Sequence, residues 1–286
     1  MEGQWFPGNM AKAMEQLRSD LKIIDLVVEL IDARVPVSSS NPTLGKLIGG
    51  KNHLVLLHKA DRGDQEENSK WLAYFRNRGK QAILFSVHEK ESLNKFKSYL
   101  KQQEEKIGPA RLKRPLRLMI VGIPNVGKST LINHIVRRTA TRTGNQPGIT
   151  RGRQWIKIMP GIELLDTPGV LWPKIEEMAG YPLAAVGAMP VGRMDSYEVA
   201  CWLIASYLEQ ERMDLLAQRY AGLKAGEPED ILEQVGRMLG CLIAGGKVDY
   251  DRASTLFLKD FQGGALGRLT LEKAPDGEWE EEEVGP

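Results

Sequence analysis

The first two thirds of the chain alternate between short apolar runs and longer segments with helical spacing. The apolar runs are Leu26–Ile31, His53–Leu57, Gln81–Val87, Leu116–Val121 and Gly161–Leu165. Between them, apolar residues recur at the intervals of one helical face in Met10–Lys22, Ser92–Lys106 and Ser129–Arg138. Short strands separated by helices are typical of a mainly parallel sheet that is covered on both faces. We therefore predict an α/β fold with about six mostly parallel strands.

The pattern changes near Pro182, beyond which helical spacing dominates. The predicted helices are Tyr197–Gln210, Met213–Tyr220, Pro228–Leu242 and Asp249–Phe261, and only a weak strand pattern follows at Arg268–Leu271. We predict a first domain over residues 1–178 and a small helical domain over residues 179–286. Beyond Gly263 the chain is rich in Gly and Glu, and we expect it to be frayed and to end in an acidic tail.

A phosphate-binding motif lies between a predicted strand and a predicted helix. It reads Gly122-Ile-Pro-Asn-Val-Gly127-Lys128-Ser129 and fits the P-loop pattern. Its glycines allow backbone N–H groups to surround a β-phosphate, next to the positive end of the helix. Lys128 should contact the β- and γ-phosphates, and the Ser129 hydroxyl should bind magnesium. The predicted nucleotide contacts of this segment are Asn125, Val126, Gly127, Lys128, Ser129 and Thr130.

Two further segments fit contacts with magnesium and the γ-phosphate. Asp166-Thr-Pro-Gly169 follows a predicted strand, so Asp166 suits the outer shell of the magnesium ion and the Gly169 N–H can bond the γ-phosphate. Thr150, in Pro147-Gly-Ile-Thr150, can complete the magnesium shell when a γ-phosphate is present, or it is an ordinary loop threonine. We expect Lys128, Thr150 and Gly169 to take part in catalysis.

Two segments that precede the P-loop fit recognition of a guanine base. His58-Lys59-Ala60-Asp61 follows a predicted strand, and Asp61 can accept hydrogen bonds from both N1–H and the 2-amino group of guanine. The stem of Lys59 would cover one face of the base. At the end of the next strand, backbone N–H groups of Ser86 and Val87 can reach the guanine O6. The sequence therefore predicts GTP rather than ATP as the ligand.

Base-reading segments ordinarily follow the phosphate-binding ones, and a circular permutation of the P-loop GTPase sheet would produce the order seen here. With these motifs, and with Trp5-Phe-Pro-Gly-Asn-Met-Ala-Lys12 and Asp32-Ala-Arg-Val-Pro36, the sequence resembles the circularly permuted GTPases of ribosome assembly. The resemblance extends over about the first 190 residues, and the helical domain agrees in position and character only.

This resemblance implies a factor that joins a late precursor of the large ribosomal subunit, contacts its ribosomal RNA and leaves after GTP hydrolysis. Many GTPases carry a water-orienting glutamine directly after the Gly that corresponds to Gly169. Members of this family have an apolar residue there instead, and Val170 fits that pattern. Hydrolysis should therefore be slow alone and be completed by an element that ribosomal particles order, or by a cation. In similar GTPases the side-chain oxygen at the position of Asn125 helps to hold potassium, so we expect K⁺ beside Mg²⁺.

The chain departs from the family pattern at His58, where the family has Asn, and at Asn9, where it has His. One ring N–H of His58 can still reach guanine N7, so we expect guanine specificity to survive and affinity to fall. Asn9 cannot take up and return a proton near neutral pH, so it can only position water or the γ-phosphate. It could also cap the helix predicted over Met10–Lys22.

Composition narrows the remaining possibilities. The 286 residues are 42% apolar and 27% charged, with a formal net charge of +2, and neither a signal peptide nor a membrane span is visible. We expect a cytoplasmic protein that is a monomer away from the ribosome. Basic residues cluster in Arg111–Arg117 and Arg137–Arg153. Cys201 and Cys241 lack disulfide or metal spacing and are predicted to be reduced, buried thiols.

Three alternatives stay open from sequence alone. The chain could bind ribosomal RNA with negligible turnover, or it could be an ATP-using P-loop transferase. The transferase alternative gives His58-Lys-Ala-Asp61 no role. The helical domain could dock on RNA or be a structural bundle with solvated charges. Its candidate RNA contacts are Arg193, Arg212, Arg219 and Arg237.

Overall fold

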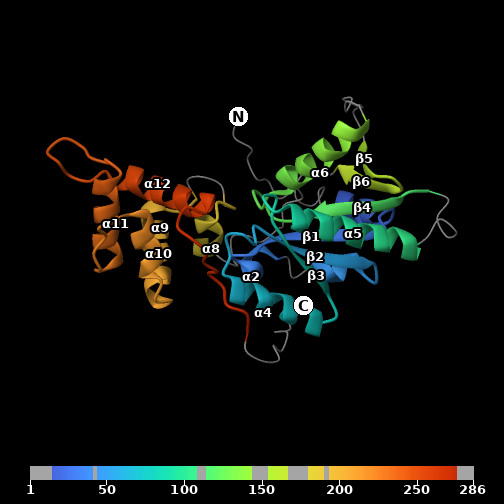
Figure 1. Cartoon of the computed structure of the whole chain (residues 1–286), viewed down its shortest axis with the longest axis horizontal. Helices are drawn as coiled ribbons and strands as arrows, with labels where there is room; N and C mark the ends of the chain where they lie inside the picture. Colours follow the sequence, from blue (N-terminus) through green and yellow to red (C-terminus); the bar gives the residue numbers. More distant parts are fainter. Residues whose placement is uncertain are drawn as a thin grey trace.

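The computed structural model describes residues 15–40, 44–107, 114–143, 154–166, 180–189 and 193–275. A six-stranded sheet with its covering helices lies beside a helical bundle (Figure 1). The strand order is β3-β2-β1-β4-β6-β5. The strands are β1 Leu26–Asp32, β2 Asn52–His58, β3 Gln81–Phe85, β4 Leu116–Val121, β5 Gln154–Met159 and β6 Ile162–Asp166. Only β5 runs antiparallel to its neighbour, so the predicted α/β fold is confirmed.

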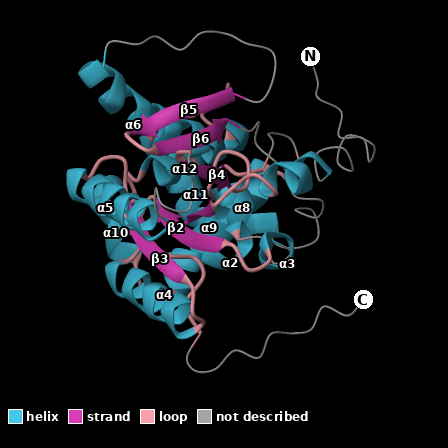
Figure 2. Cartoon of the chain, turned by 90° about the vertical axis from the view of Figure 1, so that its right-hand side faces the viewer, coloured by secondary structure: helices cyan, strands magenta, loops and turns pink. Residues whose placement is uncertain are grey.

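Both faces of the sheet are covered, as the apolar runs predicted. All seven residues of β1 are buried, because this strand is central and helices lie on either side of it. Alternate residues of β2 belong to different cores: Leu54 and Leu56 belong to the larger cluster, and Val55 and Leu57 to a smaller one. The larger core includes residues of α5 and the smaller one residues of α4, so these helices cover opposite faces (Figure 2).

The helices of this part are α2 Pro36–Ser39, α3 Leu44–Ile48, α4 Gln65–Asn77, α5 Lys90–Ile107 and α6 Lys128–Thr143. Residues 15–21 are also helical, which agrees with the helix predicted there. The sequence analysis did not predict α4. Its beginning is fixed by the carboxylate of Asp64, which accepts hydrogen bonds from the backbone N–H groups of Glu66 and Glu67. Trp71 and Phe75, one turn apart, are its buried contacts with the sheet.

The helical domain comprises α8 Gly180–Ala185, α9 Ser196–Glu209, α10 Met213–Arg219, α11 Pro228–Met238 and α12 Tyr250–Gly263. The four predicted helices are therefore confirmed, but the one predicted over Pro228–Leu242 ends at Met238, and Leu242 forms an antiparallel bridge with Val248. Asp195 and Asp249 cap α9 and α12 through their side chains. The helix α12 ends at Gly264, whose φ of 86° is the left-handed conformation that glycine adopts without strain.

The segment Gly264–Pro275, which we call the C-terminal strap, returns from α12 to the loops at the strand ends. Leu266, Leu269 and Thr270 are buried, so the expectation of a frayed chain from Gly264 is wrong for this segment. The weak strand predicted at Arg268–Leu271 is also wrong, because these backbone groups bond loops rather than a sheet edge. Residues 276–286, with the acidic tail, and the predicted domain boundary at residue 178 lie outside the described residues.

The described residues contain no helix that is long and apolar enough to cross a membrane. Cys201 and Cys241 are free thiols, as predicted. Cys241 is fully buried, whereas Cys201 is only partly buried.

Candidate nucleotide-binding site

The predicted motifs meet at one edge of the sheet. Five parallel strands carry their carboxyl ends there, so the residues that follow β2, β3 and β4 become neighbours, and Asp166 ends β6 at the same edge. From β1 the chain proceeds outward to β2 and β3 and then returns to β4 on the other side of β1. Ligands of open α/β sheets bind at such a reversal of strand order. The permuted chain order thus preserves the spatial neighbourhood of P-loop and base-reading loop.

The P-loop between β4 and α6 has the backbone geometry of an anion cradle. A Cβ at Gly122 would lie 2.5 Å from the carbonyl oxygen of Leu30, so only glycine fits against β1. Asn125 and Gly127 have φ values of 54° and 113°, which turn successive N–H groups inward. Helix α6 begins immediately afterwards, at Lys128, and directs its positive end at the loop.

Among the described residues, Lys128 is held inside this cradle by contacts with backbone carbonyl groups. Its Nζ donates to the carbonyl oxygens of Gly122 at 2.6 Å and Ile123 at 2.7 Å. Burial lowers the pKa of this ammonium to about 8. A phosphate beside it would supply the missing negative charge and raise that pKa again. Ser129 and Thr130 are exposed in the first turn of α6, where the Ser129 hydroxyl can reach a magnesium ion.

Backbone contacts hold the segment His58–Asp61, which is predicted to read the base and which we call the base-reading loop. Lys59 has a φ of 58°, and the Ala60 N–H donates to the carbonyl of Phe85 at the end of β3. The Asp61 carboxylate is 22% exposed. Its contact with Arg62 Nε is long, at 3.9 Å, so both oxygens can still accept hydrogen bonds from a base. Ser86 is buried, and its hydroxyl accepts from the His88 N–H at 3.1 Å.

His58 joins the base-reading loop to the P-loop. A Cβ at Gly127 would lie 2.6 Å from the Cε1 atom of the His58 ring, so the ring packs directly on the P-loop backbone. The ring is 3% exposed and stacks on Phe85. Within the described residues, the ring faces the Val126 backbone, and neither ring nitrogen makes a well-formed hydrogen bond. Burial, aided by the nearby Lys59 ammonium, lowers the pKa of His58 to about 4, which keeps the ring neutral.

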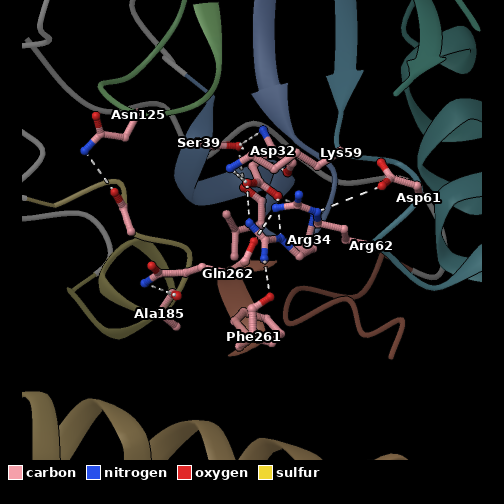
Figure 3. Close-up of polar contacts among 12 residues, drawn as sticks. Asp32, Arg34, Ser39, Lys59, Asp61, Arg62, Asn125, Ala185, Phe261 and Gln262 are labelled. Atoms are coloured by element: carbon pink, nitrogen blue, oxygen red, sulfur yellow. Dashed lines mark hydrogen bonds and ion pairs between the residues drawn. The ribbon is translucent and has the colours of Figure 1, made fainter. Parts of the chain in front are cut away.

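Asn125 contacts a segment outside its own loop. Its Nδ2 donates to the carbonyl oxygen of Gly187, beyond the end of α8, at 3.0 Å (Figure 3). This contact braces the P-loop against the segment that follows α8. With the N–H group engaged at Gly187, the side-chain oxygen stays able to accept a cation.

Several predicted site residues fall outside what the structure describes. Asn9, Thr150 and Gly169 lie in segments that are not described. The backbone of Asp166 ends β6, which places it at the correct edge of the sheet, but its side chain is not described. The roles assigned to these residues stay predictions.

A buried charge cluster was missed by the sequence analysis, which used Asp32 and Arg34 only to recognise the family. Asp32 is 1% exposed and Arg34 is fully buried. The Arg34 Nε and Nη2 atoms bond the two Asp32 oxygens at 2.9 and 2.8 Å, and Lys59 Nζ lies 2.9 Å from Oδ2 (Figure 3). Burial alone would raise the pKa of Asp32, but the two cations outweigh it and hold that pKa well below its usual range.

Several basic side chains proposed for RNA already have acidic partners. Arg219 pairs with Asp260 at 2.7 Å, and Arg237 pairs with Glu233 at 2.7 Å. Arg212 lies 3.6 Å from Asp64, and in the basic cluster before β4 Arg114 lies 2.7 Å from Asp25. These ion pairs favour a structural role for the arginines of the helical domain.

Comparison with known proteins relates this chain to GTPases that are named for the ribosome. Residues 117–224 match the family model described as 50S ribosome-binding GTPase. The chain is 41% identical to Ribosome biogenesis GTPase A of Bacillus cereus, over 94% of this chain and 93% of that one. It is 34% identical to mouse Mitochondrial ribosome-associated GTPase 1, over 94% and 90%. The structure resembles GNP-bound YlqF from T. maritima, with a TM-score of 0.65 and 29% identity over 93% and 99% of the two chains.

Proposed function

The chain belongs to the circularly permuted GTPases of ribosome assembly, and on that premise we propose that it binds a late precursor of the large ribosomal subunit and leaves after hydrolysis. Family membership makes it a GTP-hydrolysing enzyme with a role in ribosome assembly. The large subunit, its ribosomal RNA and the cytoplasm as the place of action belong to the proposal. The structural observation that best supports the GTP site in this proposal is the packing of His58 on Gly127, which brings the base-reading loop against the P-loop.

In this proposal the residues of the cradle bind and orient the triphosphate. The N–H groups of Asn125–Thr130 surround the β-phosphate, and Lys128 exchanges its two carbonyl partners for phosphate oxygens. The exposed Ser129 hydroxyl, with Asp166 and Thr150, would hold Mg²⁺. The ion would neutralise charge on the β- and γ-phosphates. Asp61 would read the guanine edge, the Lys59 stem would cover its face, and Ser86 and Val87 would direct N–H groups at O6.

For positioning the attacking water, the chain supplies fewer candidate polar groups than for binding the phosphates. Val170 has no polar group, so we propose that Asn9 and the Gly169 N–H orient the water and the γ-phosphate after ribosomal RNA orders the amino-terminal segment. Phosphoryl transfer through a loose transition state requires little proton abstraction, so an amide can suffice. This assignment predicts turnover that is slow alone and faster on ribosomal particles.

We also propose that the Asn125 side-chain oxygen helps to hold a potassium ion near the phosphates. The amide orientation imposed by Gly187 supports this role, because it leaves the oxygen as the unengaged end. A cation there would stabilise charge that develops between the β- and γ-phosphates. Replacing potassium with sodium at constant ionic strength should slow hydrolysis severalfold, and Asn125→Ala should abolish the difference. Equal rates in the two salts for the natural chain would refute a potassium site.

The deciding experiment compares hydrolysis of GTP and ATP by the full chain, alone and with large subunits, small subunits or large-subunit precursors. We expect slow GTP turnover that large-subunit particles accelerate, no ATP turnover, and none of either with Lys128→Ala. Particle binding without GTP turnover would instead support an RNA-binding module. Preferential use of ATP would support a transferase.

A further inference from the structure

We propose that Asp32 and Arg34 are positioning residues for the base-reading loop, and that through them guanine-nucleotide affinity depends on docking of the helical domain. This inference rests on the nucleotide site proposed above. It concerns residues that lie beneath that site and need not touch the base themselves. The cluster and its contacts with α12 are drawn in Figure 3.

The first link joins the base-reading loop to Asp32. Lys59 is in the left-handed conformation, and its ammonium, 15% exposed, bonds Asp32 Oδ2 at 2.9 Å. Asp32 ends β1, the strand beside β2, and the Ala33 N–H donates to the carbonyl of His58 at 2.8 Å. The end of the Lys59 side chain is therefore fixed by a buried carboxylate, and the stem that would cover the base is fixed with it.

The second link joins Asp32 to the helical domain. The Nε and Nη2 atoms of Arg34 donate to the two oxygens of Asp32, and its Nη1 donates to the carbonyl oxygen of Phe261 at 3.2 Å. The guanidinium carbon also lies 4.9 Å from the centre of the Phe261 ring. Phe261 belongs to the last turn of α12, where the helix dipole favours a cation, and its carbonyl oxygen also accepts from the Gly264 N–H at 3.0 Å. Arg34 thus completes the end of α12.

A parallel set of contacts holds the other side of the base-reading loop. Arg62, directly after Asp61, donates to the carbonyl oxygen of Gln262. The C-terminal strap then adds two backbone bonds, from Leu269 N–H to Arg62 at 3.1 Å and from Leu271 N–H to Arg34 at 2.8 Å. The residues on both sides of the base-reading motif are therefore fastened to α12 and the strap.

Burial makes this arrangement cooperative. Removing Phe261 from Arg34 would leave a fully buried cation with fewer partners, which is costly in a low-dielectric interior. The charges therefore favour one arrangement in which Lys59, Asp32, Arg34 and the end of α12 are all in place. By linkage, a ligand that needs Lys59 in that position favours the docked helical domain, and docking favours the ligand to the same degree.

The test uses two substitutions on the same helix in the full-length chain. Phe261→Leu removes the ring from Arg34. Phe257→Leu is the matched control, because Phe257 is equally buried but stacks on Tyr220 inside the helical domain. Leu keeps the backbone carbonyl that Arg34 bonds, so we expect Phe261→Leu to weaken GDP binding about fivefold, the scale of one lost cation–π contact, and Phe257→Leu to leave it within about twofold. Equal GDP affinity of the two variants would overturn the proposal.

A second measurement, on the unaltered chain, tests the same proposal if Phe261→Leu does not fold. Hydrogen exchange of the strap amides of Leu269 and Leu271 should slow when GDP is added, although neither residue belongs to the nucleotide site. Arg34→Lys, which keeps the charge and loses the fork, should weaken GDP binding and remove this protection. Strap exchange that ignores GDP would overturn the proposal.

Failure of the proposed nucleotide site gives a different result. If the unaltered chain does not bind GDP, or if Asp61→Asn binds it equally well, the site assignment fails. If both behave as expected while Phe261→Leu binds GDP like Phe257→Leu, the site stands and only the link to the helical domain falls.

Discussion

At the scale of single residues, we propose that guanine selection depends on the carboxylate of Asp61. Both oxygens can accept, which matches the N1–H and 2-amino donors of guanine. Asp61→Asn exchanges one acceptor for an N–H donor, which suits the 2-carbonyl of xanthine. We expect GTP affinity to fall roughly tenfold to a hundredfold, the loss of one or two charge-assisted bonds, and xanthosine triphosphate to bind better than GTP. Competition binding measures both, and unchanged GTP affinity would contradict the assignment.

His58 should make the stability of the chain depend on pH. Its pKa is about 4 in the folded chain, against 6.5 for an unburied histidine, so the unfolded chain binds a proton that the folded chain refuses. Stability is therefore complete above pH 6.5 and is lost as pH falls towards 4. His58→Asn should remove this loss, which amounts to about 2 kcal/mol between pH 7 and pH 5.

Urea unfolding at pH 7 and pH 5 measures this difference, and the other histidines cancel because both proteins contain them. Asp32 does not interfere, because its lowered pKa affects stability only below its ordinary range. The substitution should also leave guanine specificity unchanged and tighten guanine nucleotides by about 1 kcal/mol, since Asn offers an amide to the base. An identical pH dependence of the two proteins would show that His58 is not a buried neutral ring.

At the scale of elements, the C-terminal strap should stabilise the sheet domain. The Glu272 carboxylate accepts hydrogen bonds from Val37 N–H at 2.6 Å and Ser38 N–H at 3.1 Å, at the start of α2. Glu272→Ala should lower the free energy of unfolding by about 1–3 kcal/mol, because these donors lose their acceptor. The exposed neighbour Lys273 is the control, and Lys273→Ala should change it by less than about 0.5 kcal/mol. Equal thermal or urea stability of both variants would show that the Glu272 carboxylate does not stabilise the sheet domain.

The elements that the sequence predicted well are those with a local signal. β1, β2, β4 and β6 are apolar runs, and the P-loop combines a strand, a glycine pattern and a helix start within a few residues. The helix α4 also had a local signal, Asp64 three residues before Glu67 and then Trp71 and Phe75 at helical spacing, so it could have been found. β5 is an edge strand whose Lys157 interrupts the apolar pattern, and the sequence analysis assigned no element to it.

The parts that could not be predicted depend on contacts between distant residues. The partner of Arg34 in α12 is 227 positions away in the chain, and the strap bonds Asp64 through Thr270 over 206 positions. In neither pair does the type of one residue indicate its partner. The strap is an extended segment, and such a segment acquires its conformation from the surface on which it lies. The local clue to the cluster was an acidic residue, Asp32, as the last residue of a fully buried strand.

At the scale of the whole molecule, the permutation and the strap have related consequences. The permuted order frees the chain after β6 to continue into the helical domain, and α12 with the strap brings it back to the ends of β1 and β2. The helical domain is thus fastened at the base-reading end of the site, and Asn125 adds a contact to Gly187 from the P-loop side. A particle that holds the helical domain would therefore act on both halves of the nucleotide site.

Association with ribosomal particles should depend on salt through the basic segment between α6 and β5. Each Lys or Arg that contacts a phosphate releases counterions, so removing Arg151 and Arg153 should reduce the slope of log affinity against log salt by about 1.5 to 2. The matched control is Arg219→Gln with Arg237→Gln, because both side chains are already engaged by Asp260 and Glu233. The control should bind large subunits with the unaltered slope. Sedimentation with large subunits over a series of potassium chloride concentrations measures the slopes, and equal slopes for the two double variants would show that the loop arginines make no phosphate contacts.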